Sequence, residues 1–201
     1  MKTLVVEKSK IRAKLETVKE QAGRAQVIAV LKANAYGLGM REMAGLCREA
    51  GIRRFAVTEP IDAVHLRDWG FGEEEILVLR STACEEEIRQ ILDAGATATV
   101  GSYDAALALN GLAESQGMVC DVHMKVDTGM GRYGFLPTEI DRILSVFRYL
   151  TNLQPPGSDG NMAAGFFRRS VRQIRDPGIS AVPSSGAAIP VAGCTSGSGF
   201  A

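Results

Sequence analysis

The segment Val27–Gly39 reads VIAVLKANAYGLG. It opens on a short apolar run, Val27–Leu31, of the kind that forms a strand buried on both faces of a parallel sheet. A turn with two glycines follows, and helical spacing of apolar residues begins at Met40. The segment therefore predicts a strand–turn–helix unit with Lys32 at the carboxyl end of the strand.

The same unit repeats through the first 150 residues, with strand starts about 20 to 26 residues apart. We expect strands at Val27–Leu31, Arg53–Thr58, Ile76–Leu79, Ala96–Val100 and Val119–Val126. We expect helices at Lys8–Ala22, Met40–Ala50, Glu59–Trp69, Glu85–Ala94, Ser102–Gln116 and Pro137–Leu150. Strands that are joined through helices form a parallel sheet, which predicts the α/β class. Five such units suit either a doubly wound sheet or five-eighths of a (β/α)8 barrel.

The composition changes near residue 153. The stretch 151–201 holds five of the seven prolines and eight of the 22 glycines, but only six of the 46 charged residues. We therefore expect the repeating βα units to end at residue 152, with no sixth strand beginning after Asn152. Residues 153–201 are predicted to be an irregular or disordered tail rich in Gly, Pro and Ser, produced by a frameshift or a truncation.

The bulk composition excludes several classes of function. Lys+Arg and Asp+Glu both number 23, so the sequence lacks the excess of positive charge that is typical of nucleic-acid-binding proteins. No run approaches about 18 apolar residues, so no membrane span is expected. The charged start is unlike a signal peptide, which predicts a cytoplasmic protein. The four cysteines form no CxxC pair and there are two histidines, so no metal site is predicted.

Lys32 is the first candidate for chemistry. Burial at the carboxyl end of a parallel strand lowers the pKa of a lysine and favours nucleophilic amine chemistry such as Schiff-base formation. Tyr36, four residues later, can aim its hydroxyl at the same place. The alternative is a lysine that reaches solvent beside glycines that only turn the chain.

The second candidate segment, His123–Phe135, reads HMKVDTGMGRYGF and ends the fifth predicted strand. Lys125 is expected on the strand and Arg132 on the loop beyond it. An arginine there can hold a carboxylate or a phenolate oxygen through paired donors. Asp127 can tie the loop down or pair with a cation. The alternative is a glycine-rich loop with a surface arginine.

Together these segments resemble one family, alanine racemase. KANAYGLG is similar to its pyridoxal phosphate signature, which usually reads KANAYGHG, and HMKVDTGMGRYGF is similar to its companion motif. FAVTEPIDAVHLRDWGFGEEEILVL resembles its second and third βα units, so the resemblance covers about residues 8–150. It implies a fold-type III, pyridoxal-phosphate-dependent (β/α)8 barrel, of which residues 1–152 would form a partial barrel of about five βα units.

The resemblance also implies roles for individual residues. Lys32 would carry pyridoxal 5'-phosphate as an internal aldimine and act as one of two racemisation bases. Tyr36 would lie near the cofactor phosphate, and Arg132 would bind its phenolic oxygen and the substrate. Lys125 matches a lysine that is carbamylated in some members, and Leu38 replaces the common histidine.

The family's second base is a tyrosine from the partner subunit of a homodimer. The tyrosines of this chain are Tyr36, Tyr103, Tyr133 and Tyr149, and none follows residue 150. The resemblance thus implies an enzyme that interconverts L- and D-alanine for peptidoglycan, recorded here as a truncated chain with weak or no activity. The alternatives are a non-enzymatic barrel fragment, a serine racemase or an amino-acid decarboxylase of the same fold.

Overall fold

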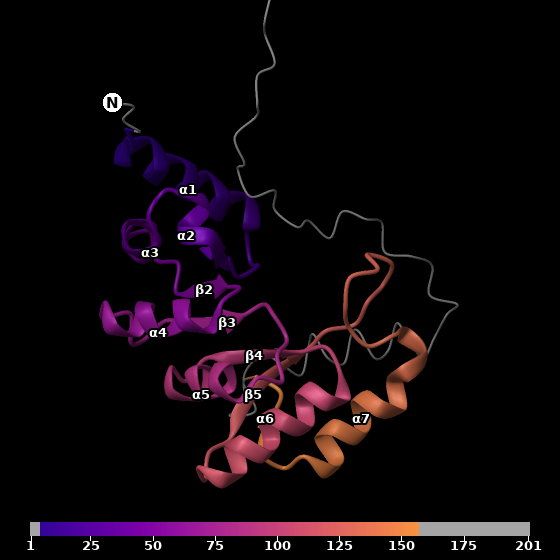
Figure 1. Ribbon diagram of the computed structural model, residues 1–201. Coiled ribbons are helices and arrows are strands. Elements are labelled where there is room, and N and C mark those ends of the chain that lie inside the picture. The colour runs from indigo at the N-terminus through magenta and orange to yellow at the C-terminus, as the bar shows by residue number, and fades with distance from the viewer. Residues whose placement is uncertain (1–4, 157–201) are drawn as a thin grey trace, which may run out of the picture.

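The computed structural model describes residues 5–156 (Figure 1). Six parallel strands form one sheet in the order β1-β2-β3-β4-β5-β6. The strands are β1 Ala29–Val30, β2 Arg54–Val57, β3 Glu75–Val78, β4 Thr97–Val100, β5 Cys120–Met124 and β6 Leu153–Gln154. The helices are α1 Lys8–Ala22, α2 Lys32–Tyr36, α3 Met40–Glu49, α4 Pro60–Asp68, α5 Glu85–Asp93, α6 Tyr103–Ser115 and α7 Ile140–Tyr149, with a 3-10 turn, η1, at Pro137–Glu139.

The strand order decides between the two architectures that the repeat left open. In a doubly wound sheet the order reverses partway, whereas here each strand pairs with the next one in sequence. Connections between parallel strands are right-handed, and here every connection leads to the next strand on the same side. All the connecting helices therefore lie on the same face of the sheet. Figure 1 shows these helices following one another around its outside. The predicted α/β class and barrel family are confirmed.

The prediction that no sixth strand begins after Asn152 is wrong. Leu153 and Gln154 pair with β5, and the amide of Cys120 donates to the carbonyl of Asn152 at 2.8 Å. The side chain of Asn110 on α6 holds this crossover by accepting a hydrogen bond from the Asn152 amide at 3.0 Å. A contact between residues 42 positions apart thus starts the strand despite the prolines that follow. The rest of the predicted tail, residues 157–201, lies outside the described residues.

The core lies between the sheet and its helices. The strand side chains that face the helices are apolar and buried, among them Phe55, Val57, Ile76 and Val78. Phe55 meets Phe71 edge to face, with ring centroids 5.7 Å apart. These contacts fix the strands, and so fix the loops that leave their carboxyl ends. Within residues 5–156, no helix is both long enough and apolar enough to cross a membrane.

Candidate active site at the carboxyl ends of the strands

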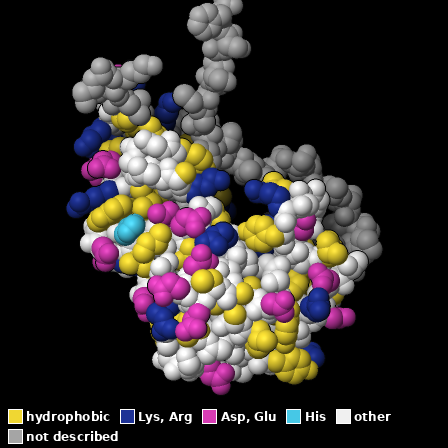
Figure 2. All heavy atoms as spheres, in the orientation of Figure 1, with side chains coloured by type: hydrophobic (Ala, Val, Ile, Leu, Met, Phe, Trp, Pro, Cys, Tyr) yellow, Lys and Arg dark blue, Asp and Glu magenta, His cyan; other side chains and the backbone are white. Residues whose placement is uncertain are grey.

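Both predicted motifs emerge from the same edge of the sheet. The first follows β1 and the second follows β5, and parallel strands present their carboxyl ends together. In (β/α) barrels this edge carries the active site. Figure 2 shows Lys and Arg side chains on both sides of the hollow between the α1–α2 part and the loop after β5.

The turn that carries Lys32 is a left-handed helix. β1 starts two residues later and ends one residue earlier than predicted, at Val30, and Ala33 through Tyr36 all have φ between +51° and +55°. Residues with a Cβ avoid this conformation at a cost of about 1–2 kcal/mol each, and they visit it singly rather than in runs. The sequence predicted only a glycine-containing turn here, so the left-handed run is a finding of the structure.

Hydrogen bonds at both ends of the left-handed turn hold it in place. The amide of Ala35 donates to the carbonyl of Leu31 at 2.8 Å, and the amide of Met40 donates to Oδ1 of Asn34, also at 2.8 Å. Gly37 and Gly39 then have φ of +85° and +95°. The motif therefore specifies a strained and over-determined backbone, a feature that clusters at functional sites.

Lys32 and Tyr36 lie side by side on this turn. Nζ of Lys32 is 5.8 Å from the centroid of the Tyr36 ring, and Tyr36 is 48% exposed. Among residues 5–156, neither the Lys32 amine nor the Tyr36 hydroxyl has a hydrogen-bond partner or an ion pair. Both groups are therefore available to a ligand.

Asp127 organises the second motif. Its carboxylate accepts hydrogen bonds from the backbone amides of Gly129, Met130 and Gly131 at 3.0, 2.9 and 2.9 Å. The bonds from Gly129 and Gly131 are the main reason that the pKa of Asp127 lies below its usual value. Of the two roles that the sequence allowed for this residue, the structure shows that it ties the loop down.

Two cations lie at this loop. Lys125 follows directly after β5 rather than lying on the strand, and its Nζ is 5.3 Å from the centroid of the Tyr133 ring. Arg132 is exposed, with its Nε 3.2 Å from Sδ of Met130. Neither forms an ion pair within the described part of the chain.

A third cation at this edge is already neutralised. Arg80, which follows β3, pairs with Glu87 at 2.7 Å and with Glu59 at 2.8 Å. The hydrogen bond from Arg80, supported by one from Thr82, lowers the pKa of Glu87. Within residues 5–156, the cations at this edge that have no ion pair are those of the two motifs.

Sequence reasoning missed Tyr133. Its hydroxyl donates to the carbonyl of Leu79 after β3, and its ring lies against Gly101 after β4. An aromatic residue next to the candidate arginine, in a loop otherwise rich in glycine, is the signal that could have singled it out. The structure brings Lys32 together with Tyr36, and Lys125 together with Tyr133. Within residues 5–156, no hydrogen bond, ion pair or cation–ring interaction links these two pairs.

Known proteins resemble this chain in sequence and in fold. Residues 6–158 match the family described as alanine racemase, N-terminal domain. The alanine racemase of Methanococcus maripaludis is 40% identical over 136 residues, which cover 67% of this chain and 36% of that protein. The chain thus spans little more than a third of that relative's length.

Solved structures of alanine racemases are similar to this chain in fold. The alanine racemase of Clostridium difficile 630 has a TM-score of 0.69 and 25% identity, covering 83% of this chain and 45% of that one. A Bartonella henselae alanine racemase with covalently bound pyridoxal phosphate has a TM-score of 0.68, covering 84% of this chain and 52% of that one. Its 21% identity supports the fold alone.

Proposed function

This chain belongs to the alanine racemase family through its N-terminal domain, and on that premise we propose that it binds pyridoxal 5'-phosphate at Lys32. One observation carries the proposal. The signature lysine stands on a strained turn at the carboxyl edge of a barrel sheet, beside Tyr36, with its amine unpaired among residues 5–156. Lys125 and Arg132 stand at the same edge.

The residues present suit the groups of this cofactor. Its aldehyde needs an amine, which Lys32 offers, and its phosphate needs donors close to an accessible backbone. Nothing lies within 4 Å of a Cβ built on Gly37, so the turn is open to a ligand beside the Tyr36 hydroxyl. The guanidinium of Arg132 can donate to the phenolic oxygen through paired N–H groups. We propose these three side chains as the cofactor set, with Arg132 also binding the substrate carboxylate.

Pyridoxal phosphate, when bound, withdraws electrons from an amino-acid substrate and so acidifies its Cα–H. In our proposal Nζ of Lys32 takes or returns this proton on one face of the substrate carbon. Racemisation needs a second base on the opposite face. Tyr133 is a poor candidate because its hydroxyl is bound to the Leu79 carbonyl. We propose that the second base is a tyrosine from the partner subunit of a homodimer, as the family resemblance implies. No tyrosine follows residue 150 of this chain, so a second copy of it would not supply that base, and we expect it to racemise alanine slowly or not at all.

On this proposal the enzyme interconverts L- and D-alanine in the cytoplasm and supplies D-alanine for peptidoglycan. The decisive experiment concerns the cofactor. The full chain is mixed with near-stoichiometric pyridoxal phosphate, reduced with borohydride and mapped by peptide mass spectrometry. We expect one dominant adduct, on Lys32.

Lys32→Ala should abolish this adduct, while Lys14→Ala, on the exposed face of α1, should leave it intact. An adduct spread evenly over surface lysines, or unchanged in Lys32→Ala, would refute the proposal. Polarimetric assays with L-alanine, D-alanine and L-serine then test the reaction and its substrate. Racemisation at ordinary enzymatic rates would show that this chain, or a second copy of it, does supply a second base, and would contradict the expected weak activity.

A further inference from the structure

We propose that Tyr133 is a positioning residue, which fastens the loop 127–135 to the ends of β3 and β4 and thereby holds Arg132 and Lys125 toward the cofactor. The inference rests on the proposed function, since it assumes a ligand at Lys32. It concerns a side chain that is 37% exposed, so burial alone does not hold it in place.

The first attachment is a hydrogen bond from the Tyr133 hydroxyl to the carbonyl of Leu79, 54 positions away in the chain. That carbonyl belongs to fixed backbone, because the amide of Leu79 donates to the carbonyl of Val57 on β2 at 2.7 Å. The loop after β5 is therefore tied across β4 to the end of β3.

The second attachment is steric. A Cβ built on Gly101 would lie 2.7 Å from Cδ2 of the Tyr133 ring, closer than real Cβ atoms come, and 3.1 Å from Cε2, which is tighter than most real contacts. The backbone does not require glycine at this position, since Gly101 is not among the residues with positive φ. The ring of Tyr133 therefore accounts for the glycine, and the two residues fit each other.

The third contact links the anchor to the site. Nζ of Lys125 lies 5.3 Å from the ring centroid, within the range of a cation–π interaction. Arg132 is the neighbour of Tyr133 in sequence, so a fixed Tyr133 also fixes the backbone from which Arg132 extends. Asp127 shapes the tip of the loop through its own backbone, whereas Tyr133 joins the loop to other strands.

The experiment uses the full chain with Tyr133→Phe, Gly101→Ala and the double variant, and Tyr149→Phe on α7 as the matched control. Two quantities are measured: the rate of trypsin cleavage after Arg132 without cofactor, and the concentration of pyridoxal phosphate that half-saturates the Lys32 adduct. Tyr133→Phe should raise both about fivefold, which corresponds to one net hydrogen bond. Gly101→Ala should raise both at least as much, because it displaces the whole ring.

Coupling between the two positions separates positioning from general loss of stability. If the ring and Gly101 act as one unit, the double variant will be no worse than Gly101→Ala alone. Additive effects that follow the urea midpoint would overturn the proposal, as would a loosened loop with unchanged cofactor affinity. If the unmodified chain forms no Lys32 adduct, the proposed function fails, and the trypsin result alone then decides whether Tyr133 anchors the loop.

Discussion

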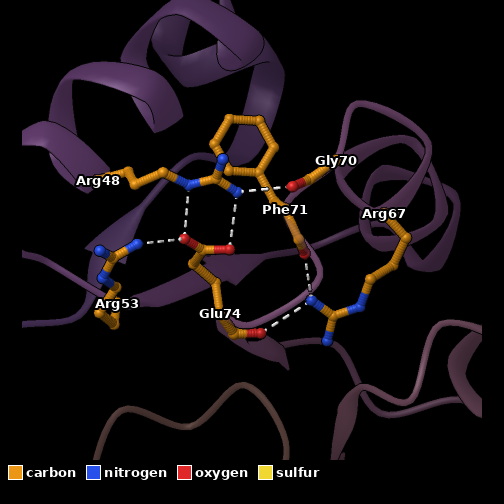
Figure 3. Close-up of polar contacts among 6 residues, drawn as sticks. All are labelled: Arg48, Arg53, Arg67, Gly70, Phe71 and Glu74. Atoms are coloured by element: carbon orange, nitrogen blue, oxygen red, sulfur yellow. Dashed lines mark hydrogen bonds and ion pairs between the residues drawn. The ribbon is translucent and has the colours of Figure 1, made fainter.

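The two ends of this parallel sheet differ in how their charged side chains are paired. At the amino ends of β2 and β3, Glu74 is 2% exposed and its carboxylate is bound by Arg48 at 2.6 Å and Arg53 at 3.0 Å (Figure 3). At the carboxyl ends, Lys32 and Arg132 have no ion pairs within the described residues, and the backbone at Lys32 runs through a left-handed turn. One end holds a buried carboxylate in ion pairs, and at the other end the cations of the two motifs have no ion pair within the described residues.

Arginines complete the amino-end network by binding main-chain oxygens. Arg48 donates to the carbonyl of Gly70 at 2.8 Å and places its guanidinium 4.1 Å from the centroid of the Phe71 ring. Arg67 donates to the carbonyls of Glu74 at 2.8 Å and Ala94 at 2.7 Å. Burial by itself would raise the pKa of Glu74, but the hydrogen bonds from Arg48 and Arg53 outweigh burial and hold that pKa below its usual value.

At the carboxyl end, the hydrogen bonding of the buried polar atoms is less complete. Nε of Arg80 is buried there without a hydrogen-bond partner, the one such side-chain atom found among residues 5–156. The difference shows how one sheet supports both stability and chemistry. The buried carboxylate of Glu74 and the arginines that bind it lie at the edge that faces away from the site, where they stabilise a sheet that carries strain and unpaired cations at its other edge.

Replacing Glu74 with Gln should give the largest loss of stability. It removes the charge that Arg48 and Arg53 bind; because both arginines reach solvent while the carboxylate is buried, the loss should be that of charged hydrogen bonds, about 1.5–3 kcal/mol. Because the pKa of Glu74 is lowered on folding, its contribution is present above about pH 4.3 and is lost as the pH falls through the lowered pKa. Urea unfolding at several pH values measures both effects.

The matched control is Glu75→Gln. Glu75 pairs with Arg54 at 2.8 Å, but its side chain is 66% exposed, so its loss should cost no more than about 1 kcal/mol. Equal losses for the two glutamates would mean that burial at Glu74 does not set the difference between the edges.

Local patterns in the sequence predicted most of the fold. The helix expected at Lys8–Ala22 has those bounds in the structure, and the other helices that were predicted begin and end within one residue of prediction, apart from the 3-10 turn before α7. The left-handed α2 was not predicted. Features set by distant contacts were not predictable. Asn110 fixes the start of β6 from 42 residues away, and Arg48 reaches Glu74 across 26 residues. The periodic spacing of apolar residues, from which the helices and strands were predicted, carries no information about such long-range polar pairs.

In the candidate site, too, some residues could be predicted from local sequence and others could not. Motif resemblance singled out Lys32 and Arg132, and the acidic residue among glycines suggested the anchoring role of Asp127. The fit of Tyr133 against Gly101 joins segments 32 residues apart, and the left-handed run at Ala33 breaks the conformational preference of its own residues. Neither the Tyr133–Gly101 fit nor the left-handed run could be predicted without the three-dimensional structure.

Asp127→Asn should have a smaller and more local effect than the change at Glu74. The carboxylate holds only the amides of its own loop, so hydrogen exchange at Gly129, Met130 and Gly131 should speed up while the urea midpoint changes little. Because the pKa of Asp127 is lowered in the fold, loop protection is present above about pH 3.9 and is lost as the pH falls through the lowered pKa. Asp141→Asn, on α7, should leave this exchange unchanged. A large fall in the urea midpoint for Asp127→Asn would show that the carboxyl edge also anchors the fold.

The smallest effect should have the opposite sign. At Ala33, φ of +51° is strained for alanine and relaxed for glycine, so Ala33→Gly should stabilise the chain by roughly 0.5–1 kcal/mol after the entropy cost of glycine. The same substitution at Ala13, on the exposed face of right-handed α1, should destabilise it by about 0.5–1 kcal/mol. Urea unfolding of the two variants compares one chemical change in backbones of opposite hand. If both destabilise, the turn at Lys32 is not left-handed in solution, and strain no longer distinguishes the carboxyl edge from the amino edge.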